Sequence, residues 1–138
     1  MKVLVDSSAW IDFLNGHRSP ESDLLARLVT GDAELLTCAP VVAEVFQGLR
    51  RDAERSRLEK LFRRLAWIEH RGIDSALRAA KVFRDLRAAG ITVRSTIDCL
   101  IAVLAEENGG LLLARDRDLA AIADSGLLRL GLLSAAGR

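Results

Sequence analysis

Short apolar runs alternate with longer amphipathic stretches along the whole chain. The apolar runs predict strands at residues 2–5, 34–38, 67–69, 111–114 and 127–130. The amphipathic stretches between them have the length and spacing of helices. Helices are therefore expected at residues 8–14, from Pro20 to the residue before Gly31, at 40–49, at 53–65, at 73–89, from Ser95 to Asn108, and at 116–124.

This alternation predicts the fold class. Strands that are separated by helices pair in parallel, so we expect an α/β protein, a three-layer α/β/α sandwich with a mostly parallel sheet. The runs at 2–5 and 111–114 are apolar without interruption, as in a sheet that helices cover on both faces. The chain has 138 residues with no repeat or linker, so a single domain over residues 1–138 is expected.

Composition narrows the class of protein. Twenty basic and nineteen acidic residues leave a net charge of +1, which excludes a polybasic tail and an acidic disordered chain. No apolar run approaches the roughly 20 residues of a membrane span, and Asp6 comes too early for a signal peptide. Cys38 and Cys99 lie in apolar surroundings and read as buried, reduced thiols. We therefore expect a cytoplasmic protein with no membrane association.

Four acidic residues follow or flank the predicted strands. Asp6 comes directly after the first strand, and Asp116 follows the run at 111–114 after one residue. Glu44 and Asp98 lie in the first turns of two helices. In open α/β sheets, ligands bind at the carboxyl ends of the strands. These four acids are therefore the candidate site.

Each acid also has an ordinary structural interpretation. Asp6 and Asp116 suit helix N-caps, and Ser95 with Asp98 resembles a capping box with Asp at the position of the usual Glu or Gln. Glu44 flanks the apolar side of its helix, where a solvated glutamate is common. Asp98 is the exception, because it is the only polar residue in the stretch 97–105. A carboxylate in such a buried helix needs a partner, a proton or a metal ion, and Arg94 and Ser95 are its possible partners.

Several carboxylates at one sheet edge would repel one another, and a divalent cation would relieve that repulsion. Carboxylate and water oxygens, without histidine or thiolate, suit Mg²⁺, for which Mn²⁺ can substitute. Such ions are matched to phosphoryl chemistry. Arg94, Arg115 and Arg117 lie near the same edge and could hold phosphates, although solvated surface charge is the alternative for each.

The same residues carry a family resemblance. The motifs are VDSSAWI at residues 5–11, AEV at 43–45, VRSTIDCLIA at 93–102 and ARDRDL at 114–119. In their order and spacing they resemble the PIN-domain ribonucleases of the VapC type, the toxins of toxin–antitoxin pairs. One departure is Leu119, where the family often carries an aromatic residue.

The resemblance implies a Mg²⁺-dependent endoribonuclease with a PIN-like fold that inhibits growth when it is free of its antitoxin. Its catalytic, metal-binding quartet maps onto Asp6, Glu44, Asp98 and Asp116. Asp118 matches a further acid near the metal, Ser8 a small polar residue beside the first aspartate, and Ser95 the residue that positions the Asp98 helix. The implied partners are an RNA substrate, a cognate antitoxin protein and a second copy of the chain in a homodimer.

Two other interpretations stay open at this stage. One is another Mg²⁺-dependent phosphotransfer domain, but a receiver needs an acidic pair near the first strand and a phosphatase needs Asp-x-Asp, where Ser8 stands here. The other is a catalytically silent PIN-like binding module, against which the presence of all four acids argues.

Overall fold

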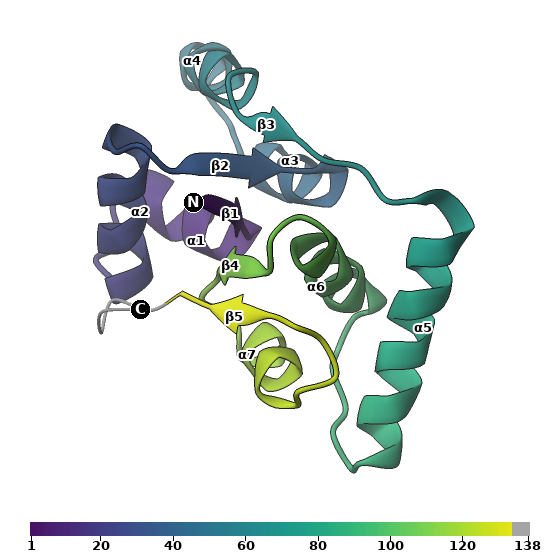
Figure 1. Ribbon diagram of the computed structural model, residues 1–138. Helices are drawn as coiled ribbons and strands as arrows, with labels where there is room; N and C mark the ends of the chain where they lie inside the picture. Colours follow the sequence, from purple (N-terminus) through teal and green to yellow (C-terminus); the bar gives the residue numbers. More distant parts are fainter. Residues whose placement is uncertain (134–138) are drawn as a thin grey trace.

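The computed structural model describes residues 1–133, in which five strands form one sheet (Figure 1). The strands are β1 (Lys2–Val5), β2 (Glu34–Thr37), β3 (Ala66–Trp67), β4 (Leu111–Leu113) and β5 (Gly131–Leu132). Their order in the sheet is β3-β2-β1-β4-β5, and every pairing is parallel. The predicted parallel sheet is thus confirmed.

Seven helices in the described part of the chain flank this sheet. They are α1 (Ser7–Leu14), α2 (Pro20–Thr30), α3 (Ala39–Phe46), α4 (Asp52–Phe62), α5 (Gly72–Ala88), α6 (Thr96–Glu107) and α7 (Arg117–Asp124). Helix α1 packs against α2 and α3, whereas α6 packs against α5 and α7. These two groups of helices and the sheet between them make the predicted α/β/α arrangement, which is confirmed (Figure 1). No helix within residues 1–133 is long and apolar enough to cross a membrane.

Local sequence explains where the helices begin and end. Helix α2 begins where the hydroxyl of Ser19 accepts a hydrogen bond from the main-chain N–H of Ser22 at 3.0 Å, with Pro20 as the first helical residue. Helix α5 ends before Gly90, whose φ of 82° is one that side-chain-bearing residues rarely adopt. The helix bounds accordingly agree with the predicted ones to within three residues.

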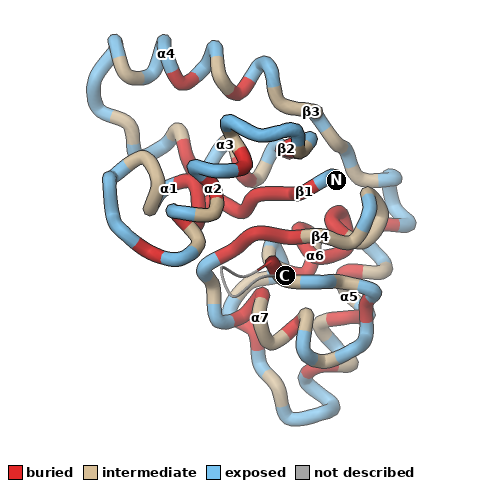
Figure 2. The backbone as a smooth tube through the Cα atoms, turned by 60° about the vertical axis from the view of Figure 1, so that its left-hand side comes forward, coloured by how far each residue is buried: buried red, intermediate tan, exposed pale blue. Residues whose placement is uncertain are grey.

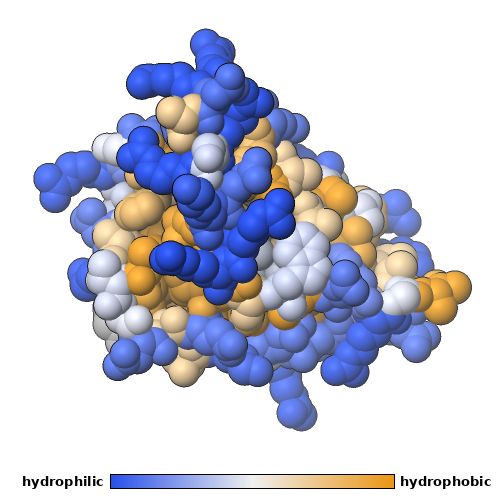
Figure 3. All heavy atoms as spheres, turned by 90° about the horizontal axis from the view of Figure 1, so that it is seen from above, coloured by the Kyte–Doolittle hydropathy of each residue, from blue (hydrophilic) through white to orange (hydrophobic). Residues whose placement is uncertain are grey.

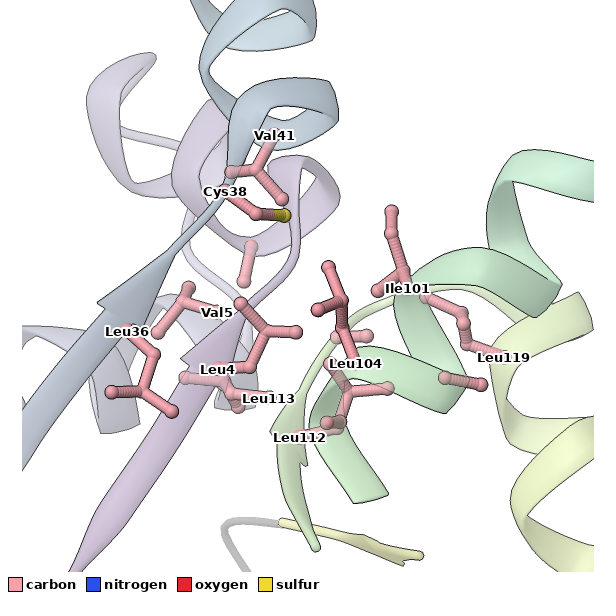
Figure 4. Close-up of a cluster of buried hydrophobic side chains, with 14 of the residues drawn as sticks. Leu4, Val5, Leu36, Cys38, Val41, Ile101, Leu104, Leu112, Leu113 and Leu119 are labelled. Atoms are coloured by element: carbon pink, nitrogen blue, oxygen red, sulfur yellow. The ribbon is translucent and has the colours of Figure 1, made fainter. Parts of the chain in front are cut away.

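The core lies on β1 and β4 and on the helix that precedes β4. Val3, Leu4 and Val5 are fully buried, and so are residues 101–104 of α6 (Figure 2). In Figure 4, the leucines of β1 and β4 lie next to Leu104 of α6, Leu36 of β2 lies on their other side, and Cys38 and Val41 lie above them. Cys38 and Cys99 are both buried and unpaired, as predicted. Each fully buried leucine of this kind contributes roughly 1.5–3 kcal/mol.

The strand order places a switch point between β1 and β4. From β1 the chain builds β2 and β3 on one side, then returns through α5 and α6 to form β4 and β5 on the other side. Ligands of open α/β sheets bind at such a point, beyond the carboxyl ends of the strands. Directly beyond these two ends, the main-chain N–H of Asp6 donates to the carbonyl oxygen of Leu113 at 2.9 Å.

The predicted last strand is wrong in its position. The prediction was residues 127–130, but β5 is Gly131–Leu132. Leucines continue from 127 to 133 on both sides of Arg129 and Gly131, so their pattern does not select the paired residues. Pairing with β4 selects them. Gly131 donates to the carbonyl oxygen of Gly110 at 2.7 Å, and a Cβ atom at Gly110 would lie only 2.7 Å from the carbonyl oxygen of Arg129. Residues 127–130 therefore form the connection that leads from α7 to this close approach.

Candidate functional site

Asp6 lies at the end of β1, and its backbone starts helix α1. It is almost completely buried, with 4% of its surface exposed. Its Oδ2 accepts hydrogen bonds from the N–H of Ser8 at 3.1 Å and from the hydroxyl of Ser8 at 2.6 Å. Burial raises the pKa of Asp6, the bonds from Ser8 oppose that rise, and the nearby charge of Asp116 adds to it. The N-cap interpretation is correct for this residue, but it occupies only one carboxylate oxygen.

Ser8 links Asp6 to the loop after β4. The hydroxyl that donates to Asp6 also accepts a hydrogen bond from the main-chain N–H of Arg115 at 3.0 Å. It thus holds the ends of β1 and β4 together and orients the Asp6 carboxylate, in the place that the resemblance implied for it.

Asp116 and Asp118 lie at the start of α7. Asp116 is its N-cap, and Oδ1 accepts from the N–H groups of Asp118 at 2.8 Å and Leu119 at 3.0 Å. The Oδ2 of Asp118 accepts from Nε of Arg94 at 2.7 Å and from its main-chain N–H at 3.0 Å. These two bonds and the charge of the guanidinium lower the pKa of Asp118. In each of these two aspartates, one carboxylate oxygen accepts hydrogen bonds from N–H groups of the protein, and the other oxygen accepts none of these bonds.

Asp98 lies in the first turn of α6, a helix that Ser95 caps by accepting from the N–H of Ile97 at 3.0 Å. Within residues 1–133, the Asp98 carboxylate makes no hydrogen bond or ion pair, so it does not complete a capping box. Burial raises the pKa of Asp98 from 3.8 to about 7, and the charges of Asp116 and Asp6 add to the effect. Neither of its two possible partners bonds to it, because Arg94 pairs with Asp118 and Asp116 and Ser95 caps the helix.

Glu44 extends from α3 toward the same acids. Its Oε1 accepts from the hydroxyl of Ser7 at 3.3 Å, a contact that joins α3 to the start of α1. Partial burial of the carboxyl raises the pKa of Glu44, and so does the charge of Asp6. An oxygen of Glu44 is left for a water molecule or another ligand.

The acids fit a hard divalent cation. Three carboxylate oxygens, one from each of Asp98, Asp116 and Asp118, lie within 4.8 Å of one another. The charges of Asp6 and Glu44 are also close enough to raise the pKa of Asp98. In Asp6, Asp116 and Asp118 one carboxylate oxygen is held by N–H or O–H donors, which leaves the second oxygen as a ligand of fixed direction. Oxygen donors without thiolate or imidazole suit Mg²⁺ and Mn²⁺. The residues thus fit such an ion.

The structure changes the relative positions expected for the site residues. Asp118, which the resemblance made an auxiliary acid, belongs to the tightest group together with Asp98 and Asp116. Asp6 and Glu44 stand beside that group, on the α1 and α3 side. All five acids nevertheless come to one edge of the sheet. Four of them were predicted there from their places in the chain, and Asp118 was implied by the resemblance.

The three candidate arginines differ in their contacts. Arg94 pairs with Asp118 and, through Nη2, with Asp116 at 3.5 Å. Arg115 turns to Asp12 of α1, with Nη1 at 2.9 Å from Oδ2. Arg117 is exposed at the first position of α7. All three flank the acids, but only Arg94 touches them.

Helix α4 carries a second group of basic residues away from the acids. Figure 3 views the molecule from above, the side on which α4 lies in Figure 1. Hydrophilic side chains gather in the middle of this view, with hydrophobic ones between them. Two of the arginines are paired within the helix, Arg55 with Asp52 and Arg63 with Glu59. Such exposed pairs contribute little to stability.

Two residues of the site were missed by sequence reasoning. Ser7 was passed over between Asp6 and Ser8, although it is the partner of Glu44. Asp12 was read as part of an amphipathic helix, although its carboxylate holds the side chain of Arg115. Both contacts join segments far apart in the chain, and no local pattern distinguishes them.

Replacing Ser8 by alanine should damage the site more than the fold. The change removes the 2.6 Å bond to Asp6 and leaves the Arg115 N–H without its acceptor. We expect a loss of about 1–2 kcal/mol in the free energy of unfolding, measured in urea. Divalent-metal affinity should fall by roughly tenfold, because partners that orient ligands have effects of that size.

Thr30→Ala is the matched control, since among the described residues the Thr30 hydroxyl bonds only to carbonyl oxygens of its own helix. It should leave metal affinity unchanged. Equal metal affinities for Ser8→Ala and the wild type would show that Ser8 does not position Asp6.

Comparison with known proteins agrees with this geometry. Residues 3–125 match the PIN domain family model. A protein of Mycobacterium bovis named VapC ribonuclease is 34% identical over 125 residues, covering 88% of this chain and 91% of that protein. The Mycobacterium tuberculosis protein named Ribonuclease VapC11 matches with the same identity and coverage.

Solved structures share the fold. VapBC-1 of nontypeable Haemophilus influenzae matches with a TM-score of 0.71 and 15% identity, over 98% of each chain. VapBC2 of Rickettsia felis, bound to a DNA fragment from its promoter, also has a TM-score of 0.71, with 18% identity over 97% of this chain and all of that chain. At these identities the similarity concerns the fold.

Proposed function

The chain belongs to the PIN domain family, and from this premise we propose that it is a metal-dependent endoribonuclease, the toxin of a toxin–antitoxin pair. One observation carries the proposal: five carboxylates from four separate segments converge beyond the carboxyl ends of β1 and β4, three of them within 4.8 Å. Relatives that share 34% of their residues with this chain are named ribonucleases, which supports the same activity.

In this proposal Asp6, Asp98 and Asp116 hold Mg²⁺, or Mn²⁺ in its place, with Asp118 beside them. A bound ion of this kind supplies Lewis acidity toward the phosphate and lowers the pKa of a bound water. The acids contribute because their free oxygens are already directed by N–H and O–H donors, so little reorganisation is needed on binding.

Glu44 is the proposed proton acceptor. Its raised pKa brings it closer to the acidity that suits a base near neutral pH, and Ser7 holds one of its oxygens. Water attacks the phosphorus, its proton passes to Glu44, and the bond from phosphorus to O3′ breaks. The leaving O3′ takes up a proton. The expected products carry a 5′-phosphate and a 3′-hydroxyl, because the 2′-hydroxyl is not the nucleophile.

Substrate RNA would be held through its phosphates. Arg94, Arg115 and Arg117 border the acids, and guanidinium groups bind phosphate oxygens in pairs of hydrogen bonds. Each of these contacts is with the RNA backbone, so none of the three selects a base.

The test is cleavage of total RNA by purified protein that is free of any antitoxin. We expect cleavage in Mg²⁺ or Mn²⁺, none after chelation with EDTA, and recovery on adding the ion back. Sequencing of the RNA ends should find 5′-phosphates at the new termini. Cleavage that persists in EDTA would contradict the proposed chemistry.

Partners follow from the same proposal. A cognate antitoxin should bind the chain and block the acids, since matching folds occur in structures described as VapBC. Its gene is expected next to this one, and coexpression should yield a stable complex. Expression of the chain alone should arrest the growth of the cells. The chain is expected in the cytoplasm, together with its proposed RNA substrate. The homodimer stays a prediction, which light scattering of the purified chain would test.

A further inference from the structure

Arg94 makes an unusual set of contacts for a surface arginine. It lies in the connection from α5 to α6, and its side chain is 64% exposed. Its main-chain N–H and its Nε both donate to the same oxygen of Asp118, Oδ2, at 3.0 and 2.7 Å. Its Nη2 lies 3.5 Å from Oδ2 of Asp116. One guanidinium therefore bridges two of the three clustered aspartates.

No other cation does this in the described part of the chain. The ion pairs within residues 1–133 include none from Lys or another Arg to Asp6, Glu44, Asp98, Asp116 or Asp118. Arg115, one residue from Asp116, is instead paired with Asp12. Within residues 1–133, Arg94 is thus the one positively charged side chain that contacts this group of acids directly, through Asp116 and Asp118.

The two contacts of Arg94 differ in what they leave available. At Asp118, both bonds go to Oδ2, so Oδ1 stays available as a ligand. At Asp116, Oδ1 is already used in capping α7, so the Oδ2 that faces Nη2 is the oxygen that a cation would need. A divalent ion and the Nη2 group therefore compete for one oxygen, whereas the ion and Nε do not.

We propose that Arg94 is an exchangeable counter-cation of the acidic centre, an inference that rests on the proposed metal-dependent function. Without a divalent ion, Nη2 partly neutralises Asp116. When an ion takes the Asp116 oxygen, Nη2 leaves it, and the guanidinium stays attached to Asp118 through Nε. The exchange is easy because the outer end of the side chain is in solvent. Arg94 thereby raises the concentration of divalent ion at which the centre fills.

The test is a titration of RNA-free protein with Mn²⁺. The electron paramagnetic resonance signal of the free ion measures how much Mn²⁺ is bound at each point. Arg94→Gln removes the competing charge and should bind Mn²⁺ about twofold to fivefold more tightly, the range that corresponds to an exposed ion pair. Arg94→Lys keeps a charge but not the planar fork, so its gain should be smaller. If Arg94→Gln does not fold, the Mn²⁺ affinity of Arg94→Lys tests the inference in its place.

Arg115→Gln is the matched control. It removes the same charge next to Asp116 but breaks only the pair with Asp12, so its Mn²⁺ affinity should stay within about twofold of the wild type. Melting temperatures provide a second measurement. Metal-free Arg94→Gln should melt below the wild type, and saturating Mn²⁺ should narrow the gap, because the variant gains more from binding.

Three outcomes would overturn the inference. Weaker Mn²⁺ binding by Arg94→Gln would mean that the arginine organises Asp118 as a ligand, and unchanged binding would mean that it does not compete. In both cases the wild type still binds Mn²⁺, so the proposed function stands. If the wild type binds no Mn²⁺, the proposed function fails together with the inference.

Discussion

Replacing Asp98 by asparagine is expected to lower the rate of RNA cleavage, as kcat/KM, by at least about a hundredfold. The substitution keeps the size of the side chain and removes one negative charge from the clustered acids. Loss of a group that only orients a metal ligand costs 10- to 100-fold, so loss of the ligand itself should cost at least about the upper figure. Asp98 makes no other side-chain bond within residues 1–133, which means that the change removes nothing else.

Cleavage of a labelled RNA in Mg²⁺ measures this effect, and growth after expression gives an independent reading. Asp6→Asn should behave in the same way. Asp124→Asn is the control, because it also removes an aspartate charge from the protein, at an exposed position at the far end of α7. If Asp98→Asn cleaves RNA and arrests growth like the wild type, Asp98 is not part of the metal centre.

The same substitution should stabilise the metal-free protein. The pKa of Asp98 is about 7 in the folded chain against an ordinary value of 3.8, so the folded state holds its proton over a range in which the unfolded state has lost it. The contribution of Asp98 to stability is therefore greatest at low pH and falls as the pH rises from about 4 to about 7. For a fully buried group, a pKa shift of this size changes the free energy of unfolding by about 4 kcal/mol. Asp98 is partly exposed, so its contribution to the free energy of unfolding is about 1–2 kcal/mol.

Urea unfolding at pH 5 and at pH 8, in EDTA, measures this contribution. The wild type should lose about 1–2 kcal/mol between these two values through Asp98, and Asp98→Asn should lack that part of the fall. The histidines are present in both proteins, so the difference isolates Asp98. Asp124→Asn should keep the wild-type slope, and saturating Mg²⁺ should reduce it. A slope that is the same in wild type and Asp98→Asn would contradict the raised pKa.

These two predictions describe one compromise. Asp98 is held near other acids, where its charge opposes folding but would serve an ion. The raised pKa values of Asp6 and Glu44 have the same cause, burial and mutual repulsion. Arg94 reduces the repulsion among the acids, since its guanidinium lowers the pKa of Asp118. A site of this kind is less stable empty than occupied, which is common where function requires clustered charge.

Local pattern predicted the centre of the fold well. The strands β1, β2 and β4 are short runs with apolar centres between amphipathic helices, so sequence alone located them to within one residue. It failed at β5, where the apolar run is longer than the strand and only the partner strand selects the register. For the same reason β3 is Ala66–Trp67, whereas 67–69 was predicted.

The sequence by itself determined the fold class and the edge of the sheet where the proposed site lies, and it pointed to the acids that the structure brings together there. These depend on local features: hydrophobic periodicity, capping residues, and an aspartate without a partner in an apolar helix. Tertiary structure alone decided that Asp118 joins Asp98 and Asp116, that Ser7 holds Glu44, and that Arg94 rather than Arg115 faces the acids. Apart from Asp116 and Asp118, which are two positions apart, those contacts join residues between 20 and 37 positions apart. Electrostatic energy depends on distances in space, and only packing of the helices on the sheet sets these distances.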